Sequence, residues 1–224
     1  AVSITKSITD KYIFIYSYRS TTSEMRFIDS DIPSSAPIVF LSRDKGHLYE
    51  VDHHENGFYI LSNKDAENKQ LLFCQSPPES ISNCKVIIPH SKETLIERFL
   101  PLKEFLITEI RINGLKKINI LNLKSTKTET ISFDEETYFT GLSLNDNYEA
   151  SNLFFSYNSM TTPSSVYNYN LNENTRELWF RKELLDKSFN PNDYESQRIW
   201  ATANDGSKIP VSLVYKKGTD LSKA

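Results

Sequence analysis

The sequence is short of the features that mark several large classes of protein. Only two of its 224 residues are cysteine, which excludes a scaffold held together by many disulfide bonds. No apolar run approaches the roughly 18 residues of a membrane-spanning helix, and residues 1–6 do not resemble a signal peptide. The 26 lysine and arginine residues do not outnumber the 29 acidic ones, so a nucleic acid is not an expected partner. We therefore expect a soluble protein that binds neither membranes nor nucleic acids.

The two cysteines, Cys74 and Cys84, flank a turn at residues 76–79 and could face each other across it. Two cysteines are ordinary in a chain of this length, and we expect both thiols to be reduced. Reduced thiols favour a reducing compartment, which predicts a cytoplasmic location.

Glycine is also scarce, with six residues, whereas 13 phenylalanines and 12 tyrosines favour strands over helices. The sequence therefore predicts a mostly β protein. Ala1 is not a translation start and the opening residues already read as a strand, so we expect a piece of a longer chain.

The apolar strands recur at a nearly constant step. Aligning the most apolar runs at Tyr12, Phe58, Glu104 and Leu153 gives steps of 46, 46 and 49 residues. A more alternating strand follows each run, at residues 24–29, 70–75, 117–123 and 165–171, and turn-forming residues separate the members of each pair. Each repeat therefore contains a β-hairpin.

Weaker strands flank these hairpins. They are expected before the hairpin at residues 47–51, 95–100 and 138–143, and after it at residues 86–88, 128–132 and 178–181. Four strands per repeat and a period in the high forties are typical of a β-propeller blade. The second strand of each repeat is apolar on both faces, as expected of a blade packed between two neighbours. The alternative, an ordinary sandwich of short strands, has no reason to repeat at a fixed step.

The last thirty-odd residues depart from the repeat. Residues 195–203 and 207–215 read as two strands around the Asp205-Gly206 turn, and Pro210 requires a position without a donated hydrogen bond. The prediction is four consecutive blades over residues 1–192, followed by a separate hairpin region over residues 193–224.

No arrangement of side chains in the sequence predicts a catalytic, cofactor or metal site. His53 and His54 are adjacent, so in a strand they point to opposite faces and cannot bind one ion. His47 and His90 are interpreted as surface or hydrogen-bonded histidines. The nearest match to a nucleophile elbow, residues 141–145, lacks the final glycine and a following helix. The acidic residues 134–136 are interpreted as a solvated turn.

Three segments carry a family resemblance. Residues 156–163 read Ser-Tyr-Asn-Ser-Met-Thr-Thr-Pro, residues 194–206 read Tyr-Glu-Ser-Gln-Arg-Ile-Trp-Ala-Thr-Ala-Asn-Asp-Gly, and residues 209–215 read Ile-Pro-Val-Ser-Leu-Val-Tyr. Residues 21–26, 36–41 and 49–53 add weaker matches, so the similarity runs through the chain in order. The sequence resembles the prolyl oligopeptidase family, and within it the oligopeptidase B group.

The resemblance implies a seven-bladed propeller that caps a Ser-Asp-His peptidase domain and admits only short peptides. It implies that the chain comprises the last four blades and the hairpin that enters the peptidase domain, the partner within the same parent chain. Substrates would be short basic oligopeptides cleaved after Lys or Arg, with no cofactor. The catalytic residues would lie downstream, so none falls on this chain, which would be inactive alone.

Two other functions stay open from the sequence. The chain could be a non-enzymatic propeller that binds a protein partner, or a propeller with an active site of its own, although no converging pair of carboxylates is identified. Four blades do not close a seven-bladed ring. We therefore expect an open arc whose exposed terminal faces pack against another copy or under the hairpin of residues 195–215.

Overall fold

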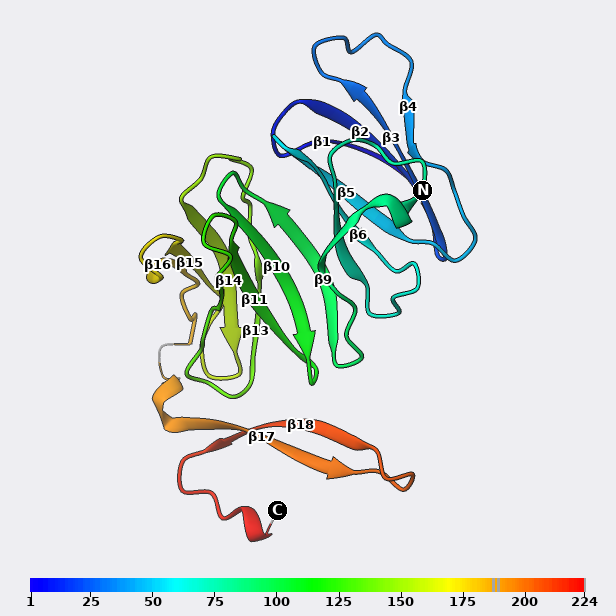
Figure 1. Ribbon diagram of the computed structural model, residues 1–224. Coiled ribbons are helices and arrows are strands. Elements are labelled where there is room, and N and C mark those ends of the chain that lie inside the picture. The colour runs from blue at the N-terminus through cyan, green and yellow to red at the C-terminus, as the bar shows by residue number, and fades with distance from the viewer. Residues whose placement is uncertain (187, 189, 224) are drawn as a thin grey trace. The chain divides into compact units, whose positions relative to one another are not determined.

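The computed structural model describes residues 1–186, 188 and 190–223, and its regular structure is almost entirely β (Figure 1). Four antiparallel sheets of four strands each follow one another along the chain, and a two-stranded hairpin follows the fourth. Within each sheet the strands are ordered as in the sequence, because short turns connect neighbouring antiparallel strands. This is the predicted all-β arrangement of four four-stranded units and a hairpin.

The strands have the following bounds. Sheet 1 contains β1 (Val2–Lys6), β2 (Tyr12–Arg19), β3 (Thr22–Asp29) and β4 (Ile38–Leu41). Sheet 2 contains β5 (Tyr49–His54), β6 (Gly57–Ser62), β7 (Gln70–Cys74) and β8 (Lys85–Ile88). Sheet 3 contains β9 (Thr94–Pro101), β10 (Phe105–Ile112), β11 (Leu115–Asn122) and β12 (Thr128–Thr130). Sheet 4 contains β13 (Tyr138–Leu142), β14 (Asn152–Ser159), β15 (Ser165–Asn170) and β16 (Thr175–Arg181), and the hairpin contains β17 (Tyr194–Thr202) and β18 (Lys208–Lys216).

Three single-turn 3₁₀ helices complete the described elements: η1 (Ile81–Asn83), η2 (Pro191–Asp193) and η3 (Leu221–Lys223). In the part of the chain that the structure describes, no helix has the length and apolar character needed to cross a membrane.

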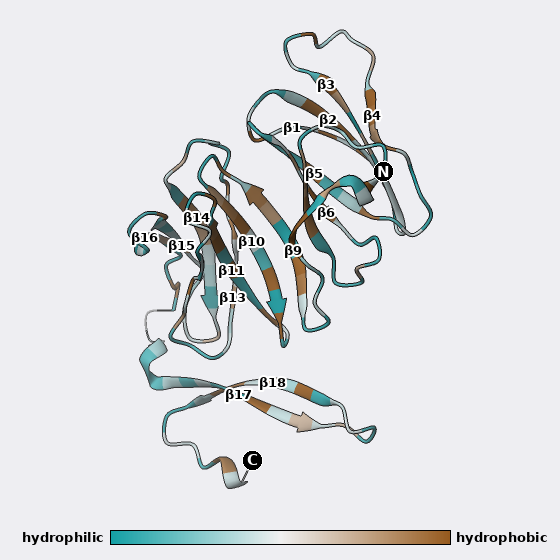
Figure 2. Cartoon of the chain, in the orientation of Figure 1, coloured by the Kyte–Doolittle hydropathy of each residue, from teal (hydrophilic) through white to brown (hydrophobic). Residues whose placement is uncertain are grey.

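The burial of the second strand differs between the middle and the outer sheets. All six residues of β6 and the first six of β10 are buried, and Figure 2 shows hydrophobic residues concentrated along β9 and β10. In β14 the burial alternates: Leu153, Phe155 and Tyr157 are buried, whereas Phe154 is partly exposed. The expectation that every second strand is buried on both faces is therefore wrong for sheet 4, and also for sheet 1, where Phe14 is the one buried residue of β2.

The expectation of reduced thiols is also wrong. Cys74, at the end of β7, and Cys84, just before β8, form a disulfide with a Cα–Cα distance of 4.9 Å. The antiparallel pairing of β7 with β8 brings the two residues together, and the intervening loop allows the sulfurs to meet. The cysteines therefore no longer support the predicted cytoplasmic location, which rested partly on their being reduced.

The chain divides into two compact units. Unit 1 comprises residues 1–111, 119–129 and 146–150, and unit 2 comprises residues 112–118, 130–145 and 151–224. The core of unit 1 is rich in rings: Phe14, Phe27, Phe40, Tyr49 and Phe58 are buried together. In unit 2, Phe155 is fully buried beside Phe133 and Tyr167.

Candidate functional site

One carboxylate in unit 2 organises the segment that carried the family resemblance. Glu135 accepts hydrogen bonds from four hydroxyl groups of this segment: Tyr157 at 2.5 Å, Ser159 at 2.6 Å, Thr162 at 2.9 Å, and Thr161. Two of these groups bind each carboxylate oxygen. Four of the five hydroxyl groups in residues 156–163 thus surround a single acidic side chain, whereas the fifth, that of Ser156, donates to the Gly141 carbonyl.

This arrangement changes the protonation of the groups involved. Burial raises the pKa of the Glu135 carboxyl, but the hydrogen bonds from Ser159, Thr161, Tyr157 and Thr162 outweigh it, so the pKa lies below its usual value. Burial and the adjacent Glu135 carboxylate raise the pKa of the Tyr157 hydroxyl. Glu135 is therefore a charged acceptor facing neutral hydroxyl donors, and its interpretation as part of a solvated turn is wrong.

The hairpin contacts two loops of unit 2 through Arg198 of β17. Its backbone N–H donates a hydrogen bond to the Glu136 carboxylate at 3.0 Å, and its guanidinium donates one to the carbonyl of Asn113. The guanidinium also lies 5.7 Å from the centre of the Trp200 ring. One arginine therefore links the hairpin to the β10–β11 turn and to the loop before β13.

Gly114 lies where this contact leaves little room. Its φ of +79° is readily adopted only by glycine, and an added Cβ would lie 3.2 Å from the Arg198 guanidinium and 3.6 Å from Pro210. The glycine therefore permits both the β10–β11 turn and the close approach of the hairpin.

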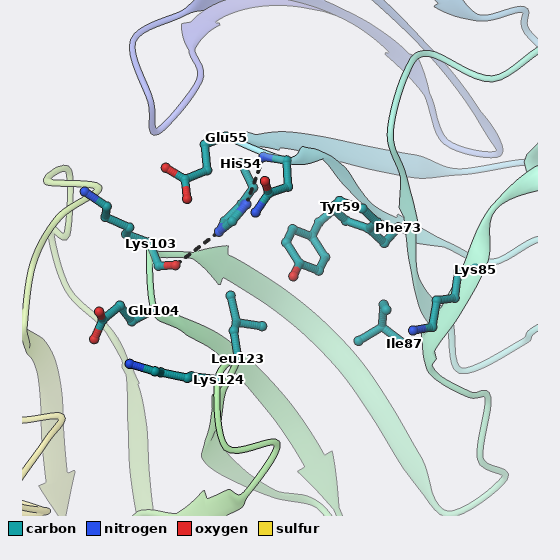
Figure 3. Close-up of a pocket in the computed structure, with 11 residues that line it drawn as sticks. His54, Glu55, Tyr59, Phe73, Lys85, Ile87, Lys103, Glu104, Leu123 and Lys124 are labelled. Atoms are coloured by element: carbon teal, nitrogen blue, oxygen red, sulfur yellow. Dashed lines mark hydrogen bonds between the residues drawn. The ribbon is translucent and has the colours of Figure 1, made fainter.

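Unit 1 contains a cleft of about 460 Å³ beside the β5–β6 turn (Figure 3). Its apolar lining consists of Tyr59, Phe73, Ile87 and Leu123. The polar lining residues are His54, Glu55, Asn56, Lys85, Lys103, Glu104 and Lys124. The cleft thus combines an apolar surface with charges of both signs.

His53 and His54 point to different surroundings, as their adjacent positions in a strand predicted. His53 shares a hydrogen bond of 2.6 Å with the Thr9 hydroxyl, whereas the Nε2 of His54 lies 3.2 Å from the carbonyl oxygen of Lys103. Across residues 1–186, 188 and 190–223, no three His, Cys, Asp or Glu side chains gather so that they could hold a metal ion.

His53 and its neighbour Asp52 have strongly displaced pKa values. Burial raises the pKa of the Asp52 carboxyl to about 6, although the backbone N–H groups of Ile8 and His53 donate to it. Burial, and after it the electrostatic effects of His54 and Lys11, lower the pKa of the His53 imidazole to about 4. Burial therefore shifts the titration of both side chains toward the neutral form in the folded state.

The other residues singled out in the sequence have structural environments. Buried His47 shares a hydrogen bond of 2.8 Å with the Ser62 hydroxyl, which confirms its interpretation as a hydrogen-bonded histidine. His90 is partly buried, and its Nε2 has no hydrogen-bond partner among the described residues. Ser143 follows the end of β13 and donates its backbone N–H to the Phe154 carbonyl, with no helix after it, so it is not a nucleophile elbow.

Comparison with known proteins connects these features to a family. Residues 1–182 match the family model described as the N-terminal beta-propeller domain of prolyl oligopeptidase. The chain belongs to the prolyl oligopeptidase family. Over 96% of its length it is 30% identical to Protease 2 of Moraxella lacunata and 31% identical to Dipeptidyl aminopeptidase BI of Pseudoxanthomonas mexicana.

A solved structure extends the match to the fold. Oligopeptidase B from Trypanosoma brucei, in its closed form with covalently bound antipain, matches 99% of this chain with a TM-score of 0.87 and 28% identity. The chain spans 30% and 29% of the lengths of these two curated relatives and 33% of the solved chain. The predicted propeller fold and the resemblance to this family are confirmed, while the boundary between residues 192 and 193 stays a prediction.

Proposed function

We propose that this chain is the propeller part of a serine oligopeptidase that cleaves short peptides after Lys or Arg. The observation that carries the proposal is the length of the similarity: the match to Protease 2 covers 96% of the chain and the match to oligopeptidase B covers 99%, beyond the residues 1–182 of the propeller model. The proposed partner is a peptidase domain in the same parent chain.

The physical role of the propeller in this proposal is a cap. A cap over a peptidase site excludes folded proteins by size and excludes water when it closes. The solved oligopeptidase B with bound antipain is described as a closed form, which supports a closing motion in that protein. In this chain the contacts of Arg198 with Asn113 and Glu136 would transmit such a motion between the sheets and the hairpin.

The proposal includes two further features, the inactivity of the isolated chain and its location. The described residues hold no nucleophile elbow, and we propose that the chain alone does not hydrolyse peptides. We also retain a cytoplasmic location as a proposal, although the disulfide removes the cysteine argument for it.

Exposed apolar residues suggest a further contact of the propeller. Val2 and Ile4 in β1, and Trp179 and Phe180 in β16, are all more than half exposed. The exposure of Trp179 and Phe180 means that the hairpin leaves this strand uncovered, contrary to one of the two arrangements expected from the sequence. We propose that a second copy or other parts of the parent chain cover these faces.

A second candidate is the release of dipeptides from the amino end of a peptide. The chain is 31% identical to a protein named Dipeptidyl aminopeptidase BI and 30% identical to Protease 2, so sequence identity favours this candidate as much as the first. The two candidates differ in where the scissile bond lies relative to the free amino terminus.

The test compares three peptides with the intact parent protein and with the isolated chain. The peptides are an amino-blocked peptide with one internal Arg, its Arg-to-Pro analogue, and the unblocked peptide with Arg at the second position. Cleavage of the blocked Arg peptide, at least tenfold faster than of the Pro analogue, is expected for the parent protein. Cleavage of the unblocked peptide alone would favour dipeptide release, and hydrolysis by the isolated chain would contradict its proposed inactivity.

A further inference from the structure

The cleft of unit 1 has the size and lining of a binding site for a small molecule. Its volume of about 460 Å³ lies within the range of about 300–1,000 Å³ found for ligand pockets. Tyr59 and Phe73 form part of its wall with ring centres 5.0 Å apart, and Ile87 and Leu123 complete the apolar lining. An apolar side chain of a ligand would therefore displace water from a preformed surface.

Two polar groups inside the cleft are available for a ligand. Tyr59 is only 5% exposed, yet its hydroxyl points into the cleft (Figure 3), and no described residue forms a hydrogen bond with it. Burial raises the pKa of this hydroxyl to about 12, so it is a neutral donor near pH 7. The Lys85 ammonium also points into the cleft, beside Ile87, and no described carboxylate pairs with it (Figure 3).

The other end of the cleft has the opposite charge. Glu55 and Glu104 lie there, whereas Lys103 is paired with Glu149 at 2.8 Å. The Lys103–Glu149 pair is neutral, and the positive charge of Lys124 offsets one of the two negative charges of Glu55 and Glu104. This end of the cleft therefore has a formal charge of −1. The cleft is therefore positive at Lys85, apolar in the middle and negative at Glu55 and Glu104.

We propose that this cleft binds a short peptide with free termini. The carboxyl terminus binds the Lys85 ammonium and the Tyr59 hydroxyl, an apolar side chain packs on Phe73 and Ile87, and the amino terminus faces Glu55. Charge-assisted hydrogen bonds between a carboxylate and an ammonium group are stronger than neutral ones, which makes the two termini the determinants of recognition. This site is non-catalytic, and its existence does not depend on the peptidase activity proposed above.

The test uses the dipeptide Leu-Phe, its carboxamide and its N-acetyl derivative in calorimetric titrations of the purified chain. Leu-Phe is expected to bind at least tenfold more tightly than the carboxamide, which corresponds to about 1.4 kcal/mol. In a Lys85→Met variant the acid and the amide should bind equally, and in a Glu55→Gln variant acetylation should no longer weaken binding. Tyr59→Phe should weaken the binding of the acid severalfold without changing the far-ultraviolet circular dichroism spectrum.

The matched control is Lys45→Met, which removes an exposed lysine from a turn outside the cleft lining. This variant should bind all three compounds like the unmodified chain. No binding of Leu-Phe by the correctly folded chain would overturn the proposal. A preference for the acid that persists in Lys85→Met would also overturn it, because the carboxylate would then bind elsewhere.

Discussion

Two adjacent phenylalanines of β14 provide a matched test of how sheet 4 is packed. Phe155 is 0% exposed, with its ring centre 5.5 Å from that of Tyr167 and 5.9 Å from that of Phe133. Burying an aromatic side chain removes about 150–250 Å² from water, and at about 25 cal/mol per Å² this is worth at most about 4–6 kcal/mol, because the unfolded chain already buries part of this surface. Phe155→Ala should therefore lower the free energy of unfolding by about 3–5 kcal/mol, since a cavity also forms.

Phe154→Ala changes the same residue type in the same strand but on the opposite face. Its ring contacts Trp179, at 5.4 Å between ring centres, and Trp179 is itself 66% exposed. We expect a loss of only about 1–2 kcal/mol because much of the environment of this ring is solvent. Urea titrations followed by far-ultraviolet circular dichroism, with equal slopes for both variants, would give the difference. A cost for Phe154→Ala equal to or above that for Phe155→Ala would refute the burial pattern.

Three further predictions concern charges and the disulfide. Asp52, with its raised pKa, stabilises the fold at low pH and loses this effect as the pH rises through about 6, whereas His53 has the opposite dependence between about pH 4 and 6.5. In the Asp52→Asn variant the free energy of unfolding should therefore fall more steeply on acidification, and in His53→Gln it should fall less steeply. The change in either slope is at most about 1.4 kcal/mol per pH unit, measured by urea titrations at several pH values. A dependence of the free energy of unfolding on pH that is unchanged in both variants would contradict both pKa shifts. The Cys74–Cys84 disulfide closes a loop with a sequence separation of 10, and its reduction should lower the free energy of unfolding by about 2–3 kcal/mol. Thermal unfolding with and without dithiothreitol measures this difference. Two titratable thiols in the untreated chain would contradict the bond. Glu135→Gln should lower the free energy of unfolding by about 1–3 kcal/mol, because a neutral amide replaces an anionic hydrogen-bond acceptor. It should also speed hydrogen exchange of the backbone amides at residues 159–162. Exchange as slow as in the unmodified chain would count against the role of this carboxylate.

The repeat could be predicted from the sequence because it depends on strand spacing. Steps of 46 to 49 residues correspond to four successive sheets, and the predicted strands of each hairpin overlap the observed ones. The outer strand of sheet 1, β4, was missed: its four residues follow a loop, and two of them are exposed. A short edge strand has little periodicity of its own, so pairing with β3 decides its conformation.

Contacts between distant residues could not be predicted in the same way. Glu135 lies in an acidic run with two exposed neighbours, and only the fold brings hydroxyl groups 22 to 27 residues away onto its carboxylate. The sequence places Cys74 and Cys84 on either side of a turn, but residue counts alone do not distinguish a disulfide bond from two thiols. The partial exposure of Phe154 likewise depends on which sheets flank β14, which strand periodicity does not report.

The central claim, that this propeller admits short peptides to a peptidase and excludes folded proteins, is tested most directly by one comparison. The same Arg-containing sequence is presented to the intact parent protein as a free peptide and within a surface loop of a stable folded protein, and kcat/KM is measured for both. We expect the free peptide to be cleaved at least about a thousandfold more efficiently, because a narrow cap makes access depend on size. Equal cleavage of the two substrates would contradict the claim.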